Sequence, residues 1–448
     1  MRPRPVLRVV ALASLLGCAL EPRDLAAFRD TAEGPAKLRA VLGDERRPTA
    51  LRAEAALTLL DLDRADVDGR SLLLDAFAAL PPASRGVLAP TVEQGLHARL
   101  RTADGALPTT RAVRAKDVGV QLLPLLDAPA RQRLGTRLMR WMSADVDHRG
   151  DAGTFTPEQL AESLGTESAV PTAEGLRPDV SPEALTRLLA VVAAHGDGAA
   201  RAAAGARLVE IERAYRARPD RAALVVARVL PALGSFADTE AARARLVAIA
   251  DDPGLPGSER ELALTLLAGS ATPAELPRLA RVALDPDAAL GLREQALARI
   301  GETGAPEALP SLLALAALRK ERSLRQRAAE LTIEIGGERS LWPLLRALPG
   351  EWNVTYARDE LEAYAARVQR LRATSYLTVL LGKRLYGPAW WGRVIAVRWF
   401  AQAPDRYDAS RRLRQHVDDT QEVLGEGWPE KWTVGREAQS ALRVLAAR

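Results

Sequence analysis

Cysteine and histidine are scarce in this chain of 448 residues. Cys18 is the only cysteine, so the chain has no second thiol for an internal disulfide and no cysteine cluster for a zinc site. The four histidines, His97, His148, His195 and His416, are scattered, and none has the paired spacing of metal ligands. We therefore expect no metal site.

Motifs of common catalytic and nucleotide-binding sites are also missing. The sequence contains no GxSxG nucleophile elbow, no GxxxxGK[ST] phosphate-binding loop and no GxGxxG dinucleotide-binding motif. Its serines and carboxylates form no recognisable acid–base arrangement. We expect a protein that is not an enzyme, needs no cofactor and has no small-molecule substrate.

Long apolar runs and a strong excess of charge are absent as well. After residue 20 no apolar run approaches the roughly 18 residues that a membrane-spanning helix needs, which excludes a polytopic membrane protein. Residues 1–17 carry three arginines and no acid, and the rest of the chain has 59 basic and 57 acidic residues. The 17 basic and 12 acidic residues in 341–448 are too dispersed to predict a nucleic acid partner.

The N-terminus has the layout of an export signal. Positive "MRPRPVLR" is followed by apolar "VVALASLLG". Leu15-Leu16-Gly17-Cys18 resembles the lipobox of bacterial lipoproteins, which implies that the leader 1–17 is removed and that the Cys18 thiol carries a diacylglyceryl group. Several acyl chains on one residue suffice for stable anchoring, and Ala19 after the cysteine favours the outer membrane by the family's sorting rule. The alternative is an ordinary signal peptide or uncleaved helix with an incidental cysteine.

Helical segments recur at a regular interval in the middle of the chain. Four similar segments begin 34, 33 and 32 residues apart, at Val225, Glu259, Leu292 and Leu324. Other helical segments lie between them, such as "TPAELPRLARVAL" and "APEALPSLLALAAL". A helix pair of this length cannot bury both its faces alone, so neighbouring pairs are expected to stack.

Capping motifs predict where several helices begin. Thr156 with Gln159, and Thr272 with Glu275, have the spacing of a capping box, and Ser181 precedes a proline in the same way. Each of these residues is expected to start a helix.

The segment "LDPDAALGLREQALARIGETGAPEALPSLLALA" resembles the HEAT-like repeats first associated with phycobilisome lyases. "LRAEAALTLLDL" from Leu51, "WGRVIAVRWFAQAPD" and "VGREAQSALRVL" are similar to its second helix. The resemblance implies an all-α fold, an α-solenoid of HEAT-like helix pairs. In that family an Asp between the paired helices bonds an Arg near the start of the second helix, which here points to Asp287 and Arg293.

Composition divides the chain into five parts. After the leader (1–17) we expect N-terminal helical repeats (18–142), a loop-rich linker (143–181) and a HEAT-like repeat core (182–349). The last part, 350–448, is a Trp-rich helical region with irregular repeats, and its charged helix "RDELEAYAARVQRLRA" is expected to interrupt the repeat rhythm.

Seven of the eight tryptophans lie in the last quarter of the chain. Adjacent Trp390 and Trp391 are not expected to face one helix core together, and Trp and Arg are frequent anchors of interfaces. A partner-binding surface is therefore predicted from Trp390, Trp391, Arg393, Arg398, Trp428 and Trp432. The alternative is that the tryptophans cover the exposed end of the solenoid.

These observations favour a membrane-anchored HEAT-repeat lipoprotein that acts as a protein-binding or scaffolding module in the bacterial cell envelope. Its protein partner is not identifiable from the sequence, and its contact with the membrane is through the lipid anchor. The alternative is a cytoplasmic or periplasmic protein of the HEAT-like lyase or maturation-factor type.

Overall fold

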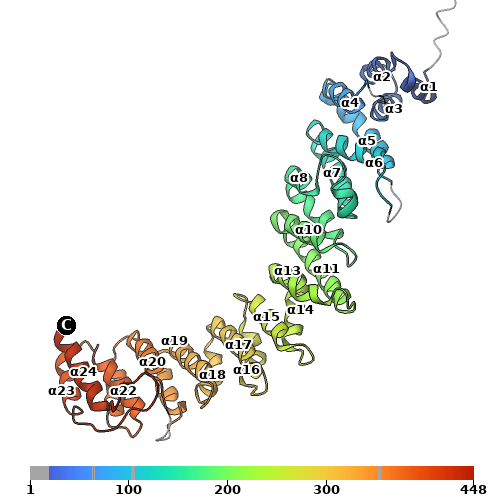
Figure 1. Ribbon diagram of the computed structural model, residues 1–448. Helices are drawn as coiled ribbons and strands as arrows, with labels where there is room; N and C mark the ends of the chain where they lie inside the picture. Colours follow the sequence, from blue (N-terminus) through green and yellow to red (C-terminus); the bar gives the residue numbers. More distant parts are fainter. Residues whose placement is uncertain (1–19, 63, 65, 102–105, 351–354) are drawn as a thin grey trace, which may run out of the picture. The chain divides into compact units, whose positions relative to one another are not determined.

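The computed structural model describes residues 20–62, 64, 66–101, 106–350 and 355–448. These residues form α helices joined by turns and by short 3-10 and π-helical segments, with two isolated β-bridges and no β strand among them (Figure 1). The predicted all-α repeat fold is confirmed. Residues 1–17, Cys18 and Trp352 lie outside the described residues, so the predicted lipid anchor stays a prediction.

The chain forms two compact units, and the boundary between Ala242 and Arg243 falls inside α14 (Glu240–Asp251). The helices of the first unit are α1 Pro22–Ala27, α2 Gly34–Gly43, α3 Thr49–Leu60, α4 Gly69–Ala78, α5 Pro82–Arg99, α6 Thr110–Leu122, α7 Ala128–Ser143, α8 Pro157–Leu164, α9 Ala169–Glu174, α10 Pro182–His195, α11 Gly198–Arg216, α12 Ala222–Leu224 and α13 Leu230–Ser235. Those of the second are α15 Gly257–Leu266, α16 Leu276–Leu284, α17 Leu290–Thr303, α18 Leu309–Ala316, α19 Arg322–Ala347, α20 Arg358–Gln369, α21 Ser375–Arg384, α22 Trp390–Phe400, α23 Arg406–Arg414 and α24 Val434–Ala447.

The segment 143–181 is part of the first unit's helical stack, so the predicted linker is wrong. It holds the π-helical turn Val146–Gly150 and helices α8 and α9, and α9 packs against α7, α10 and α11. The polar residues that suggested loops serve as helix caps. In the predicted capping box, the Thr156 amide donates to Gln159 Oε1 at 3.0 Å and the Gln159 amide donates to Thr156 Oγ1 at 3.4 Å.

The second unit is a row of helix pairs. The second helices of successive pairs contact one another in chain order: α15, α17, α19, α20, α22 and α24 (Figure 1). Each pair covers an apolar face that its neighbour leaves open, as expected for a repeat fold.

Long helix α19 belongs to two successive pairs because it is interrupted at Gly337. Gly337 has φ 60° and ψ −150°, a backbone conformation that residues with a Cβ rarely adopt. The Ser340 hydroxyl donates to the carbonyl oxygens of Thr332 at 2.8 Å and Gly337 at 2.7 Å, which holds the kink together. The part before Gly337 pairs with α18, and the part after it is the first helix of the pair completed by α20.

The charged segment predicted to interrupt the repeat therefore continues it, since it forms α20. Its buried positions include Leu361, Tyr364 and Val368, which face the core at helical spacing, while Arg358 and Glu362 are exposed on the other side.

In three helix pairs an arginine of the second helix bonds the end of the first. The fourth residue of α3, α17 and α15 is Arg52, Arg293 and Arg260, and each Nε donates to a main-chain carbonyl ten residues earlier, at the end of the preceding helix, at 2.9–3.0 Å. The last carbonyls of a helix have no partner within it, so this bond satisfies a group that packing would otherwise bury unpaired.

The expected bond between Asp287 and Arg293 is not formed. Arg293 donates instead to the Ala283 carbonyl oxygen at 3.0 Å and to Glu321 Oε1 at 3.4 Å. Asp287 is exposed in the turn, and its amide donates to Asp285 Oδ1 at 3.0 Å. Arg293 therefore joins the end of the preceding helix to Glu321, and Asp287 takes no part in this contact.

Candidate functional site

Helix α22 is enclosed on all sides, so the predicted exposed tryptophan surface is wrong for Trp390 and Trp391. The helix contacts α20, α21, α23 and α24, and both tryptophans are only 2% exposed. The Tyr356 ring lies 6.0 Å from the ring of Trp390 and 5.6 Å from that of Trp391, centroid to centroid. Two adjacent residues are both buried because neighbours cover opposite faces of the helix.

Trp428 and Trp432 are half-buried, and the indole N–H of each donates a hydrogen bond to a neighbouring residue. Trp428 Nε1 donates to the Tyr356 carbonyl oxygen at 2.9 Å, and Trp432 Nε1 donates to Glu437 Oε2 at 2.9 Å. Trp428 therefore packs against buried Trp390, with the two ring centroids 6.4 Å apart, and Trp432 positions Glu437.

The two predicted arginines lie in different surroundings. Arg393 Nε donates to the Gly387 carbonyl oxygen at 2.6 Å and its Nη1 pairs with Asp419 at 2.5 Å, so its role is to join the α21–α22 turn to the segment before α24. Arg398 instead reaches a groove between second helices, with its guanidinium carbon 5.4 Å from the Trp428 ring centroid.

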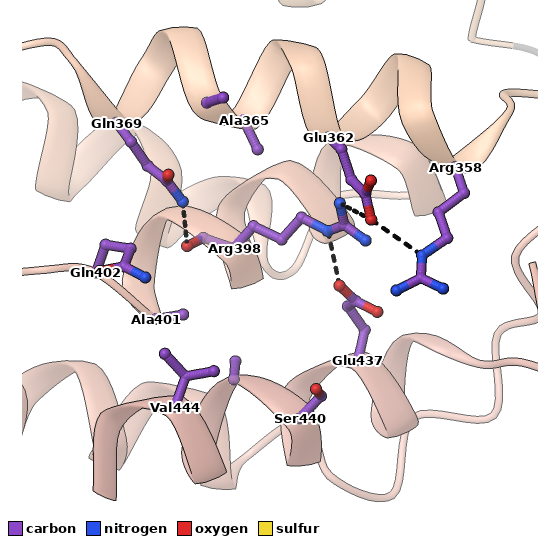
Figure 2. A pocket seen from close by; sticks show the side chains of 12 residues that line it. Arg358, Glu362, Ala365, Gln369, Arg398, Ala401, Gln402, Glu437, Ser440 and Val444 are labelled. Atoms are coloured by element: carbon purple, nitrogen blue, oxygen red, sulfur yellow. Dashed lines mark hydrogen bonds and ion pairs between the residues drawn. The ribbon is translucent and has the colours of Figure 1, made fainter. Parts of the chain in front are cut away.

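This groove runs between α20, α22 and α24 and has a volume of ≈ 330 Å³ (Figure 2). We call it the second-helix groove. It is lined by Arg358, Glu362, Ala365, Ala366, Gln369, Arg398, Ala401, Gln402, Glu437, Ser440, Ala441 and Val444. Four of these are alanines, whose small side chains keep the space between the three helices open.

A chain of ion pairs crosses the groove. Figure 2 shows Arg398 between two carboxylates, with Nε donating to Glu437 Oε1 at 2.7 Å and Nη1 3.2 Å from Glu362 Oε1. Arg358 Nε donates to the same Glu362 oxygen at 3.0 Å. Charges therefore alternate across the groove, and the two arginines balance the two carboxylates.

Polar groups beside this chain are available to a ligand. Gln369 uses its Nε2 to donate to the Arg398 carbonyl oxygen at 3.0 Å, which leaves its side-chain oxygen as an acceptor. The side chains of Gln402 and Ser440 make no hydrogen bond with other described residues, and Val444 adds an apolar contact point that is 39% exposed. Amides and hydroxyls both donate and accept, so the groove suits main-chain and polar side-chain groups.

The carboxylates and the hydroxyl of the groove differ in their partners. Both carboxylates accept bonds from arginine, and Ser440 has no histidine or carboxylate bonded to it within the described part of the chain. In residues 20–448, apart from those the structure does not describe, no group of three or more His, Cys, Asp or Glu side chains is arranged to hold a metal ion. None of the described helices is both long and apolar enough to span a bilayer.

Sequence reasoning found Arg398 but missed Glu362, Gln369, Gln402 and Glu437. The signals were weak: Arg358 and Glu362 have the spacing of a helical ion pair, and alanines recur on one side of three separate helices. Their convergence depends on how the pairs stack, which the spacing of one helix does not disclose.

Comparison with known protein families finds none that matches this chain, and comparison with curated proteins finds no match either.

Proposed function

We propose that the chain is a membrane-anchored repeat protein of the bacterial cell envelope that binds a protein partner in the second-helix groove. The observation that carries the binding role is the groove itself, where alternating charges and available amide and hydroxyl groups line an open channel across three helices. An extended peptide segment fits this chemistry. Its main-chain groups would hydrogen-bond to the side-chain amides of the groove, and its charged side chains would pair with the alternating arginines and glutamates.

The groove is tested by photo-cross-linking in the envelope. A photoreactive amino acid at Gln402, inside the groove, is expected to give a discrete protein adduct. The matched control is Gln439, an exposed residue of α24 that donates to the Val417 carbonyl and does not line the groove. Ser440→Trp fills the channel and should remove the Gln402 adduct. Equal adducts from both positions, or an adduct that survives Ser440→Trp, would contradict the groove as the binding site.

The anchor is proposed at Cys18 on the resemblance to the lipobox. The wild-type chain, expressed in a bacterium with lipoprotein machinery, is expected to incorporate labelled palmitate and to sediment with membranes. Cys18→Ala should lose both properties and retain residues 1–17, because no thiol is left for acylation. Soluble, unlabelled wild-type protein would show that the N-terminus is not a lipoprotein signal. Cross-linking at Gln402 is read separately, so the two parts of the proposal fail independently.

A further inference from the structure

Basic residues that are dispersed in the sequence gather on one face of the second unit. The face consists of the first helices of the last three pairs: the part of α19 after Gly337, α21 and α23. In residues 338–347, 372–388 and 404–416, nine arginines and lysines are accompanied by three carboxylates. We call this surface the basic face. It is formed by first helices, whereas the second-helix groove lies between second helices.

Side-chain contacts join the three helices of the basic face. The Thr374 hydroxyl donates to Glu338 Oε2 at 2.6 Å, and the guanidinium carbon of Arg384 lies 4.4 Å from the Trp342 ring centroid. At the other edge the rings of Tyr386 and His416 lie 4.7 Å apart. The cations therefore share one continuous surface.

Most of these cations have no carboxylate partner. Arg411 and Arg412 both pair with Asp408. The other seven form no ion pair with any described carboxylate: Arg339, Arg346, Arg372, Lys383, Arg384, Arg406 and Arg414. The surface therefore carries uncompensated positive charge and favours an anionic partner.

Arg384 shows this lack of compensation most clearly. Its Nε and Nη2 atoms are buried and have no hydrogen-bond partner among the described residues. Burial, together with the nearby charge of Arg346, lowers the pKa of Arg384. The guanidinium carbon lies 4.4 Å from the Trp342 ring centroid in Arg384 and 6.0 Å from it in Arg346. The two cations therefore contact an aromatic ring and not a carboxylate.

Exposed aromatic and aliphatic side chains lie among the cations. Tyr376, Val379 and Lys383 follow one another at helical spacing along the exposed side of α21, and Tyr386 is exposed in the turn after it. Tyr407 on α23 is 82% exposed, and Trp342 is 42% exposed. Cations alone would suit any polyanion, but this mixture of rings, an aliphatic side chain and cations matches the interface of a bilayer, where Trp and Tyr are enriched.

A hollow at the edge of the face extends the same chemistry. It lies between α23 and α24, has a volume of ≈ 580 Å³, and is lined by Arg406, Tyr407, Ser410, Arg414, Leu442, Arg443, Leu445 and Ala446. Three arginines and no carboxylate line it, together with apolar side chains. A phosphate headgroup with the start of its acyl chains has the matching combination of charge and apolar surface.

We propose that the basic face binds the surface of an anionic phospholipid bilayer. Cations near such a surface contribute about 1 kcal/mol each, so several together give reversible binding without an acyl chain. The basic face is separate from the second-helix groove, and its binding to a bilayer does not depend on acylation of Cys18.

The test uses the full chain with Cys18→Ser, which cannot be acylated, and measures co-sedimentation with vesicles. We expect binding to vesicles that contain phosphatidylglycerol and little binding to pure phosphatidylcholine. The face variant Arg346→Gln/Lys383→Gln/Arg414→Gln removes three exposed charges and should weaken binding by about a hundredfold at low salt.

The control variant Lys320→Gln/Lys431→Gln/Arg436→Gln removes three exposed cations of the same unit that lie outside the basic face. It should stay within about threefold of the parent. A separate Tyr407→Ala variant, which leaves every charge in place, should also weaken binding, and circular dichroism verifies that each variant is folded. Equal losses in the two triple variants would overturn the proposal. So would failure to bind phosphatidylglycerol vesicles, including the case in which the chain instead binds duplex DNA through the same residues.

Discussion

Replacing Glu360 by alanine should cost the second unit about 3–5 kcal/mol of stability, the range for removing one partner of a buried ion pair. Arg325 Nε and Nη2 donate to the two Glu360 oxygens at 2.7 and 2.8 Å, and the Glu360 side chain is fully buried. Tyr364 donates to Glu360 Oε1 at 2.7 Å, and burial followed by the carboxylate's charge raises the pKa of Tyr364, which keeps its hydroxyl protonated. Glu360→Ala therefore leaves both a cation and a hydroxyl in the core without their acceptor.

Urea unfolding followed by tryptophan fluorescence measures this effect, because seven of the eight tryptophans belong to the second unit. The matched control is Asp359→Ala, one residue earlier in α20. Asp359 pairs with Arg322, but its side chain is 72% exposed, so its loss should cost at most about 1 kcal/mol. Replacing the buried pair together, as Arg325→Met/Glu360→Leu, should recover much of the loss. Equal shifts of the unfolding midpoint in Glu360→Ala and Asp359→Ala would contradict the stabilising role of the buried ion pair.

Asp117→Ala should have a comparable effect in the first unit, again about 3–5 kcal/mol. Asp117 lies 3.0 Å from Lys116 Nζ, and the lysine side chain is fully buried. The Asp117 carboxylate also accepts from the amides of Thr154 at 3.0 Å and Phe155 at 3.3 Å, while Lys116 donates to the Phe155 carbonyl at 2.6 Å. The substitution removes the acceptor of two loop amides and leaves the lysine buried without its counterion.

The loss should appear first in the loop before α8. Hydrogen exchange of the Thr154 and Phe155 amides, measured by mass spectrometry, is expected to accelerate in Asp117→Ala. Gly153 in this loop has φ +83°, and a Cβ there would lie 2.6 Å from Asp117 Oδ2, so the loop is built closely around the carboxylate. Asp127→Ala serves as the control, since Asp127 Oδ1 accepts one bond, from the Ala130 amide at 2.9 Å, and its loss should cost about 1 kcal/mol. Unchanged exchange at Thr154 and Phe155 would refute the assigned role of Asp117.

The sequence predicts the helical elements of this protein well because they depend on local patterns. The segments from Glu259, Leu292 and Leu324 became the second helices α15, α17 and the first part of α19, and Thr156 starts a helix as its capping box predicts. Stacked pairs follow from the repeat interval of about 33 residues, since neither helix buries its apolar face alone.

The site was predicted less well because it depends on packing between elements. Trp390 and Trp391 are adjacent on one helix. If the core covered only one face of that helix, the helical period would leave one of the two side chains exposed. The core instead surrounds α22, which buries both. The polar residues of 143–181 resemble a linker in composition, although they cap helices and hold a turn around Lys116 and Asp117. Glu362 and Glu437 lie 75 positions apart in sequence and meet at Arg398 only through stacking.

The bond from the arginine of a second helix to the end of the preceding helix affects which substitutions the repeat tolerates during evolution. Arg52, Arg260 and Arg293 bond the carbonyl oxygens of Leu42, Ala250 and Ala283. Every residue type has that oxygen, so the accepting position is free to mutate while the bond persists. Each pair then needs to inherit one arginine rather than two matched residues, and its outward-facing positions can diversify into new recognition surfaces without loss of the repeat.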